Sequence, residues 1–160
     1  MKWQSFKCLY GTGREQVGDY LYRGVIMMIS TKGRYALRVM LDLAGQSQEE
    51  YISLKAISDR QGISMKYLEA IVASLSKAGM LESQRGKSGG YRLNKPASDY
   101  KVGEVLRAAE GELTAVSCLE TGKGGCDRAD ECLTLPLWQK LDQIVGEYLD
   151  SVTLADLLRV

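Results

Sequence analysis

Two short helical segments separated by a glycine-containing turn constrain the fold of this chain more than any other feature. In residues 53–79, SLKAISDRQGISMKYLEAIVASLSKAG, Ser53 and Ser64 stand where N-terminal caps are expected, and Gly62 and Gly79 follow the two segments. Serine side chains cap helices, and glycine readily adopts the left-handed conformation that ends them. The second segment repeats apolar residues at helical spacing: Leu68, Ile71, Val72 and Leu75. Two helices joined by a turn of about three to four residues that contains glycine are typical of a helix-turn-helix unit, although a plain helical hairpin looks similar.

A basic hairpin is predicted directly after this unit. Residues 81–93, LESQRGKSGGYRL, fit a strand, a glycine-rich turn and a second strand, with Arg85 and Lys87 at the tip. A helix-turn-helix followed by a hairpin is typical of a winged helix. In that fold the second helix of the unit enters the major groove, and the hairpin reaches the neighbouring backbone or minor groove. An ordinary sheet edge would not need a cationic tip, so the sequence predicts DNA binding.

Further helices are expected on both sides of the winged unit, which makes the fold class mainly α with a small β hairpin. One helix begins at Ser30-Thr31 and runs to about Gly45, and another covers residues 102–110. Pro136 is tolerated in the first turn of a long helix, and Thr153 caps a last short one.

The long C-terminal helix carries an apolar face that is too wide for a lone surface helix. Its members include Leu137, Leu141, Ile144 and Tyr148. We expect this face to be the interface of a homodimer, because a two-fold DNA site requires a two-fold protein.

Charge divides the chain into a basic and an acidic part, although the formal net charge is only +1. Residues 28–101 hold twelve Lys and Arg against seven Asp and Glu, whereas residues 102–160 hold five against eleven. We expect the first range to be the winged-helix DNA-binding domain, and the second to hold a sensor loop and the dimerisation region. No apolar run approaches the roughly 18 to 20 residues of a membrane span or suits a secretory signal. These features predict a cytoplasmic protein without a membrane partner.

Three of the four cysteines lie in the polar segment CLETGKGGCDRADECLTL, residues 118–135. Seven residues separate Cys118 from Cys126, and five separate Cys126 from Cys132. Since cytoplasmic thiols stay mostly reduced, clustered cysteines suit metal ligation or redox sensing better than a structural disulfide. Three thiolates favour an iron–sulfur cluster. Zinc is the weaker alternative, because structural zinc usually takes four protein ligands and the chain contains no histidine.

Four motifs resemble, in the same order, segments of the IscR-type winged-helix regulators, a bacterial family that also has CymR-like and NsrR-like members. They are STKGRYALRVMLDLA, ISDRQGISMKYLEAI, SQRGKSGGYRL and VGEVLRAAEG, and the resemblance covers roughly residues 28–158. It implies a dimeric transcriptional regulator that binds double-stranded DNA and is not an enzyme. The residues alone agree on the last point, because no histidine, evident nucleophile or phosphate-binding loop is available to assemble an active site.

The resemblance implies DNA contacts in the first helix, in the second helix of the helix-turn-helix unit and in the wing. The positions are Thr31, Lys32, Arg34, Ser64, Lys66, Tyr67, Glu69, Arg85 and Lys87. Arg85 matches a wing position that enters the minor groove, where a narrow groove favours a guanidinium. Lys66 replaces a small polar residue of the family, so base preference can differ. Glu69 matches an acidic residue that helps exclude one class of site in the cluster-free form, although an exposed surface charge explains it equally well.

The same resemblance implies a [2Fe–2S] cluster on Cys118, Cys126 and Cys132, but it leaves the fourth ligand unknown. The histidine of IscR-type members falls at Leu135, and the aspartate that NsrR-like members use falls at Arg34. Acidic residues within reach of the loop, none of them compelling, are Glu120, Asp127, Asp130 and Glu131. The alternative is a cluster-free regulator controlled by thiol oxidation, or by a bound enzyme of cysteine metabolism as in CymR-like members.

Residues 1–27 show neither helical nor strand periodicity, and the family's pattern begins only at Met28. We expect them to be a disordered segment or a mis-assigned leader, since Met27 and Met28 offer later starts. The alternative is a basic arm with four Lys and Arg that follows DNA from the first helix, as the arms of other DNA-binding domains do.

Overall fold

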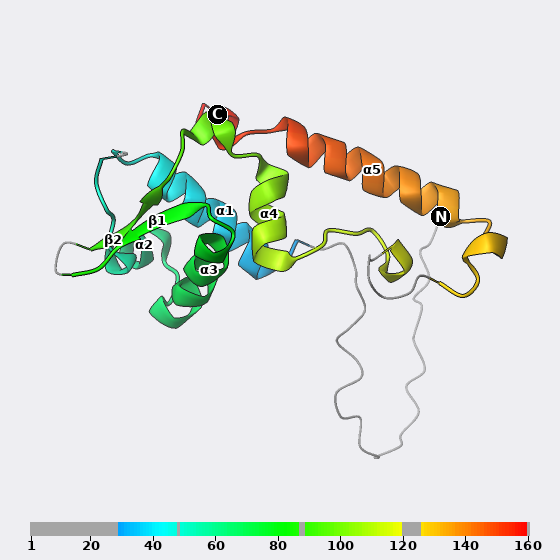
Figure 1. The fold of residues 1–160 in the computed structure, drawn as a ribbon, viewed down its shortest axis with the longest axis horizontal. Helices are drawn as coiled ribbons and strands as arrows, with labels where there is room; N and C mark the ends of the chain where they lie inside the picture. The colour runs from blue at the N-terminus through cyan, green and yellow to red at the C-terminus, as the bar shows by residue number, and fades with distance from the viewer. Residues whose placement is uncertain (1–28, 48, 87–88, 120–125, 160) are drawn as a thin grey trace, which may run out of the picture.

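The computed structural model describes residues 29–47, 49–86, 89–119 and 126–159, which are mainly helical with one small hairpin (Figure 1). The elements follow in the order α1 (Thr31–Ala44), α2 (Leu54–Gln61), α3 (Met65–Lys77), β1 (Leu81–Gln84), β2 (Gly90–Leu93), α4 (Val102–Glu110), α5 (Leu135–Ser151) and α6 (Leu154–Leu157). Short 3₁₀ turns lie at Ala97–Asp99, Ser117–Leu119 and Ala129–Glu131. The expected fold class is confirmed. The expectations for residues 1–27 and for Lys87 lie outside the described residues.

Hydroxyl caps begin α1 and α2 as the sequence predicts. Ser30 Oγ accepts from Lys32 N at 2.9 Å, and Ser53 Oγ accepts from Ala56 N at 3.2 Å. Gly62 then ends α2 with φ 66°, a left-handed conformation that glycine adopts without steric cost. Ser53 and Gly62 thus fix the start of the helix-turn-helix unit and the position of its turn.

The cap expected from the Ser64 side chain is not formed. Ser64 is the N-cap residue of α3, but within the described residues its hydroxyl makes no capping hydrogen bond. Its backbone closes the turn instead, because its carbonyl accepts from Tyr67 N at 3.1 Å and from Leu68 N at 2.9 Å. The Ser64 side chain therefore stays exposed at the start of the helix.

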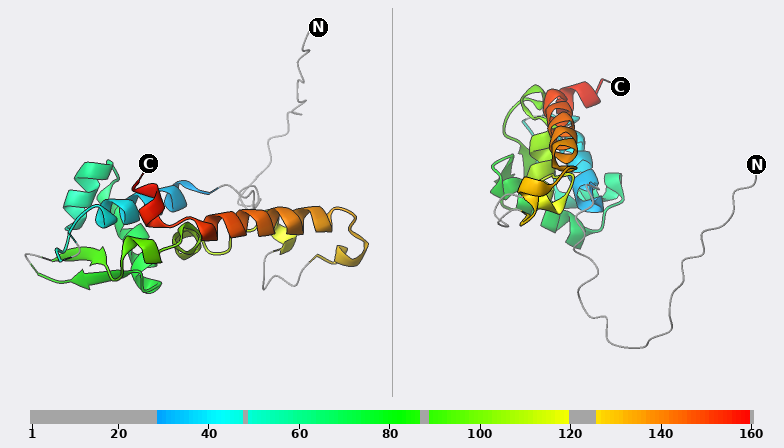
Figure 2. Two further views of the ribbon diagram at one scale, coloured as in Figure 1. Left: turned by 90° about the horizontal axis from the view of Figure 1, so that it is seen from above. Right: turned by 90° about the vertical axis from the view of Figure 1, so that its right-hand side faces the viewer.

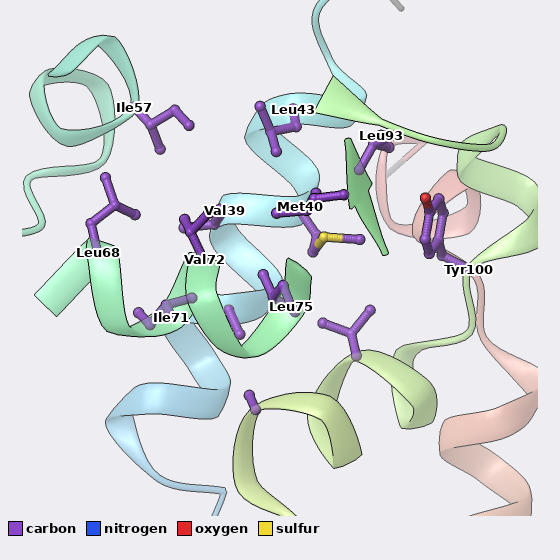
Figure 3. Close-up of a cluster of buried hydrophobic side chains, with 14 of the residues drawn as sticks. Val39, Met40, Leu43, Ile57, Leu68, Ile71, Val72, Leu75, Leu93 and Tyr100 are labelled. Carbon is purple, nitrogen blue, oxygen red and sulfur yellow. The ribbon is translucent and has the colours of Figure 1, made fainter. Parts of the chain in front are cut away.

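The hydrophobic core lies between α1, α2, α3, the hairpin and α4 (Figure 3). Its largest fully buried side chains are Tyr100, Met40, Ile57, Leu68, Ile71, Leu75, Leu106, Leu154, Val39, Val72 and Val105. In α1 and α3 the buried residues recur every three or four positions, so each helix turns one face inward and the other outward. This separation leaves the outer face of α3 available for contacts.

Tyr100 ties the hairpin to the start of α4. Its hydroxyl lies 2.8 Å from Met80 O and 2.5 Å from Asn94 Oδ1, and it accepts from Asn94 N at 3.1 Å. Burial raises the pKa of the Tyr100 phenol, despite hydrogen bonds from the backbone of Asn94 and Lys95 that act in the opposite direction. The hydroxyl therefore stays protonated and fixes the strand ends relative to the core.

The wing is an antiparallel pair of strands, and a third segment pairs with its second strand. β1 pairs with β2 up to Gln84 opposite Gly90. Ile52, which precedes α2, pairs with Tyr91: Ile52 N donates to Tyr91 O, and Tyr91 N donates to Ile52 O, both at 2.9 Å. The backbone of the hairpin is thus tied to the segment that leads into the helix-turn-helix unit.

The long helix α5 extends away from the winged-helix body (Figures 1 and 2). Its C-terminal end is attached to α4 by a bond from Val102 N to Val152 O at 2.9 Å and by an ion pair between Arg107 and Asp150. None of its residues is buried. No helix among the described residues is both long enough and apolar enough to cross a membrane.

Candidate nucleic-acid interface and cysteine segment

The N-terminal half of α3 presents most of its predicted contact residues to solvent. Ser64, Lys66 and Glu69 are exposed. Tyr67 is half-buried, because its ring packs edge-on against Tyr35 of α1 with the ring centroids 5.8 Å apart. Tyr67 was predicted to contact DNA, but part of its side chain is packed against α1.

Arg38 of α1 braces the turn between α2 and α3. Its guanidinium lies 5.2 Å from the centroid of the Tyr35 ring and donates to Gln61 O at 2.5 Å and to Gln61 Oε1 at 3.1 Å. Gln61 is the last residue of α2, so the bond satisfies a carbonyl that the end of a helix leaves without an intrahelical partner. Arg38 was not predicted from the sequence, since a single charged residue on a helix carries no local signal.

Asp42 joins α1 to α2 from a nearly buried position, with only 4% of its side chain exposed. It accepts from Arg60 Nε at 2.9 Å, from Arg60 Nη2 at 2.6 Å and from Gln61 Nε2 at 2.9 Å. Burial raises the pKa of the Asp42 carboxyl, but the hydrogen bonds and the charge of Arg60 outweigh it and hold the pKa below its usual value. An aspartate within the apolar run VMLDLA was the available sequence signal, and it was missed.

The wing presents Arg85 beyond the end of β1, where it is exposed. Below it, the carboxylate of Glu82 accepts from Arg92 Nε at 2.9 Å and Nη2 at 2.7 Å, and the Arg92 guanidinium lies 4.5 Å from the centroid of the Tyr51 ring. This cluster stiffens the base of the wing and keeps Glu82, the strand's one carboxylate, paired. Arg85 is thus the cation that the described part of the wing carries toward its tip.

The start of α1 brings together the other predicted contacts. Thr31 and Arg34 are exposed, and Arg34 Nη2 donates to Thr31 Oγ1 at 3.1 Å, while Lys32 is partly exposed. Glu110, the last residue of α4, accepts from two backbone N–H groups of this turn. Glu110 was not predicted from the sequence, because the interaction joins residues about eighty positions apart.

The cysteine segment holds three free thiols. Cys118 and Cys132 are half-buried, and Cys126 is exposed. Hydrogen bonding with Thr134 holds the pKa of the Cys132 thiol below its usual value. The bond with the Thr134 side chain has the larger effect, and the bond with the Thr134 backbone adds to it. The Sγ of Cys132 lies 3.4 Å from Thr134 Oγ1.

The donor chemistry of this segment suits an iron–sulfur cluster, but the described residues do not complete a site. Three thiols that share one segment and are in no disulfide are the donors that such clusters take. Across residues 29–47, 49–86, 89–119 and 126–159, no group of three or more His, Cys, Asp or Glu side chains is arranged to hold a metal ion. Glu120 and Cys8 lie outside those ranges, Asp127, Asp130 and Glu131 are exposed, and Leu135 begins α5.

The apolar face predicted on α5 is uncovered in the single chain. The exposed fractions are 59% for Leu137, 38% for Leu141, 51% for Ile144 and 67% for Tyr148. These residues recur at intervals of three and four, so they share one side of the helix.

A helix-turn-helix whose second helix faces solvent, followed by a hairpin with an exposed arginine, defines a winged-helix DNA-binding protein. The chain belongs to the Rrf2 family, whose model, described as "Iron-dependent Transcriptional regulator", matches residues 29–160. The expectation of a transcriptional regulator, and not an enzyme, is confirmed by this membership.

Relatives and solved structures agree with the family. The chain is 45% identical to the HTH-type transcriptional regulator IscR of Serratia proteamaculans over 132 residues, which cover 82% of this chain and 79% of that protein. It is 44% identical to IscR of Escherichia coli K12, with coverage of 82% and 80%. The structure is similar to that of CymR, the global cysteine regulator of B. subtilis, with a TM-score of 0.67, 38% identity and coverage of 82% and 96%. It is also similar to T. potens IscR, with a TM-score of 0.63, 40% identity and coverage of 81% and 85%.

Proposed function

We propose that this chain is a homodimeric regulator that binds a two-fold operator in double-stranded DNA and senses iron–sulfur or redox status through its three clustered cysteines. Residues 28–101 bind DNA, and residues 102–160 sense and dimerise, in the cytoplasm where bacterial DNA lies. One observation carries the DNA part: Lys66 on α3 and Arg85 on the wing are both exposed on elements that the core and the Ile52–Tyr91 bridge hold in place.

In this proposal α3, the wing and the start of α1 each contact a different part of the DNA. The start of α3 enters the major groove, where Ser64, Lys66 and Glu69 face base edges or phosphates. Glu69 repels phosphate unless it accepts from a cytosine amine, so it favours some sites over others. Arg85 enters the minor groove, where Lys87 supports it. The exposed start of α1 contacts the phosphate backbone through Thr31, Lys32 and Arg34, and Tyr67 contributes its hydroxyl end while its ring stays packed on α1.

Alanine substitution at Arg85 and Lys66 tests this docking. The probe is a duplex that the wild-type protein selects from a random-sequence library, and fluorescence anisotropy measures its affinity over a range of salt concentrations. Arg85→Ala should weaken binding by about 1–3 kcal/mol, and loss of a phosphate contact should reduce the salt slope by about one. Lys77→Ala is the matched control, because Lys77 is exposed on the last turn of the same helix. If both variants bind like the control, the docking is wrong.

Cys118, Cys126 and Cys132 are the residues that would hold a [2Fe–2S] cluster. Such a cluster supplies a redox- and iron-dependent group whose loss changes the charge and order of the segment that carries it. The support for it is the set of three free thiols in one polar segment, and the fourth ligand stays unassigned. With only three thiolates identified, we expect the cluster to be labile toward oxygen.

Anaerobic purification with iron, sulfide and visible-absorption analysis tests the cluster. Serine at any of Cys118, Cys126 or Cys132 should abolish the absorbance, and Cys8→Ser is the matched control that should keep it. A wild-type preparation with iron at background would exclude the cluster. It would favour the second candidate, a cluster-free regulator controlled by thiol oxidation or by a bound enzyme of cysteine metabolism. Exposure of the free Cys126 thiol supports that candidate.

The homodimer is proposed from the uncovered apolar face of α5. Exposed apolar side chains that share one side of a helix are typical of an interface rather than of a monomer surface. A second copy that packs on the same face would bury them symmetrically and would place two recognition helices on one operator.

A further inference from the structure

A single carboxylate from α4 caps the first turn of α1. Glu110 Oε1 accepts from Ser30 N and from Gly33 N, each at 2.9 Å. Ser30 Oγ accepts from Lys32 N, so three N–H groups at this helix start have partners. Figure 1 shows the blue start of α1 beside the end of α4.

The local sequence of α1 leaves room for this distant carboxylate. In a usual capping box, an acidic side chain at the third helical position reaches back to the N-cap N–H. Here that position is Gly33, and the first turn of α1 has no acidic residue. A Cβ at Gly33 would overlap Glu110 Oε1. Glu110 therefore takes the role of the missing local side chain, and its negative charge lies where the helix dipole favours it.

The turn that Glu110 holds is the one that carries the predicted backbone contacts. Thr31 and Lys32 lie between the two N–H groups that it accepts from, and Arg34 comes directly after them. The end of α4 is itself well fixed, because Ala109 in its last turn and Val105 and Leu106 in the turn before are buried. The carboxylate thus ties an exposed, cationic turn to a rigid helix.

We infer that Glu110 is a positioning residue for DNA binding, which holds the first turn of α1 in the orientation where Thr31, Lys32 and Arg34 meet phosphates. The inference rests on the proposed function, because those three contacts belong to it. It assigns to a negative residue a favourable effect on DNA affinity. Simple electrostatics predicts an unfavourable effect of Glu110 on DNA affinity, since removal of a carboxylate near a polyanion strengthens binding.

Amide hydrogen exchange measured by NMR tests the cap without DNA. Glu110→Ala should accelerate exchange at Gly33 by about tenfold or more, because bonds to a charged acceptor are lost, while Met40 in the middle of α1 stays protected. Gly33→Ala should act in the same direction although alanine is the better helix former, because its Cβ displaces the carboxylate. In the double variant the two effects should not add, since both remove one contact. Unchanged exchange at Gly33 in Glu110→Ala overturns the inference.

DNA affinity, measured with the selected duplex, tests the consequence. Glu110→Ala should bind several-fold more weakly and with a smaller salt slope, and Glu110→Gln, which keeps an acceptor oxygen, should recover part of the affinity. Glu50→Ala is the matched control, because it removes one exposed carboxylate elsewhere in the domain. Faster exchange combined with affinity equal to that of the control also overturns the inference. If the wild type selects no duplex, the proposed function has failed, and the exchange arm still decides whether Glu110 holds the turn.

Discussion

Replacing Ile144 by lysine tests whether the apolar face of α5 is the dimer interface. Ile144 is 51% exposed in the single chain, so about half of its apolar surface is left for a partner to bury. Full burial of such a side chain is worth roughly 1.5–3 kcal/mol, which leaves about 1 kcal/mol for each subunit and about 2 kcal/mol for the dimer. Lysine loses this contribution.

Lysine also brings an ammonium group to each side of the interface. An unpaired buried charge costs several kcal/mol, although the long side chain can bend its charged end toward water and reduce that cost. We take about 1 kcal/mol per subunit for what remains, so the dimer is weakened by about 4 kcal/mol in total. Since about 1.4 kcal/mol corresponds to a factor of ten, the dissociation constant of the dimer should rise by about a thousandfold.

Sedimentation equilibrium at micromolar protein measures this change, and Gln139→Lys is the matched control. Gln139 is exposed on the same helix, and its spacing places it on the side opposite to Ile144, so it adds the same charge away from the proposed interface. The control should remain dimeric and bind a two-fold operator, whereas Ile144→Lys should be monomeric and lose site-specific binding. Equal dimer stability in the two variants would refute the interface.

Two further predictions concern stability and the N-terminal segment. Asp42→Asn should lower the free energy of unfolding at pH 7 by about 1–2 kcal/mol, because it removes the charge that accepts from Arg60 and Gln61. The folded state lowers the pKa of Asp42, so this stabilisation is full above about pH 4 and declines as the pH falls further. Urea unfolding should therefore show that the difference in free energy of unfolding between variant and wild type shrinks below about pH 4. A difference that stays constant down to about pH 3 contradicts a stabilising role for the ionised Asp42 carboxylate. Deletion of residues 1–27 should leave DNA affinity unchanged if they are a leader and weaken it if they are an arm. An intact mass of the native protein that includes Trp3 excludes the leader.

The order and type of the elements could be predicted from the sequence because their signals are local. Ser30 and Ser53 cap helices within three residues, Gly62 supplies a left-handed turn at its own position, and the apolar residues of α3 recur at helical spacing. The wing followed from a glycine-rich turn between two short strands. Ser64 shows where this reasoning ends, since a serine at an N-cap can leave its hydroxyl unused when the backbone closes the turn.

The contacts that position the candidate interface were decided only by the tertiary structure. Glu110 meets Gly33 across 77 positions, and Asp42 meets Arg60 across 18, so no local pattern contains both partners. The half-burial of Tyr67 against Tyr35 also depends on how α1 and α3 pack. Charged and aromatic side chains suit many surfaces equally well by themselves. Their partners are selected when the apolar faces of the helices pack together, because that packing brings distant backbone segments within hydrogen-bond distance.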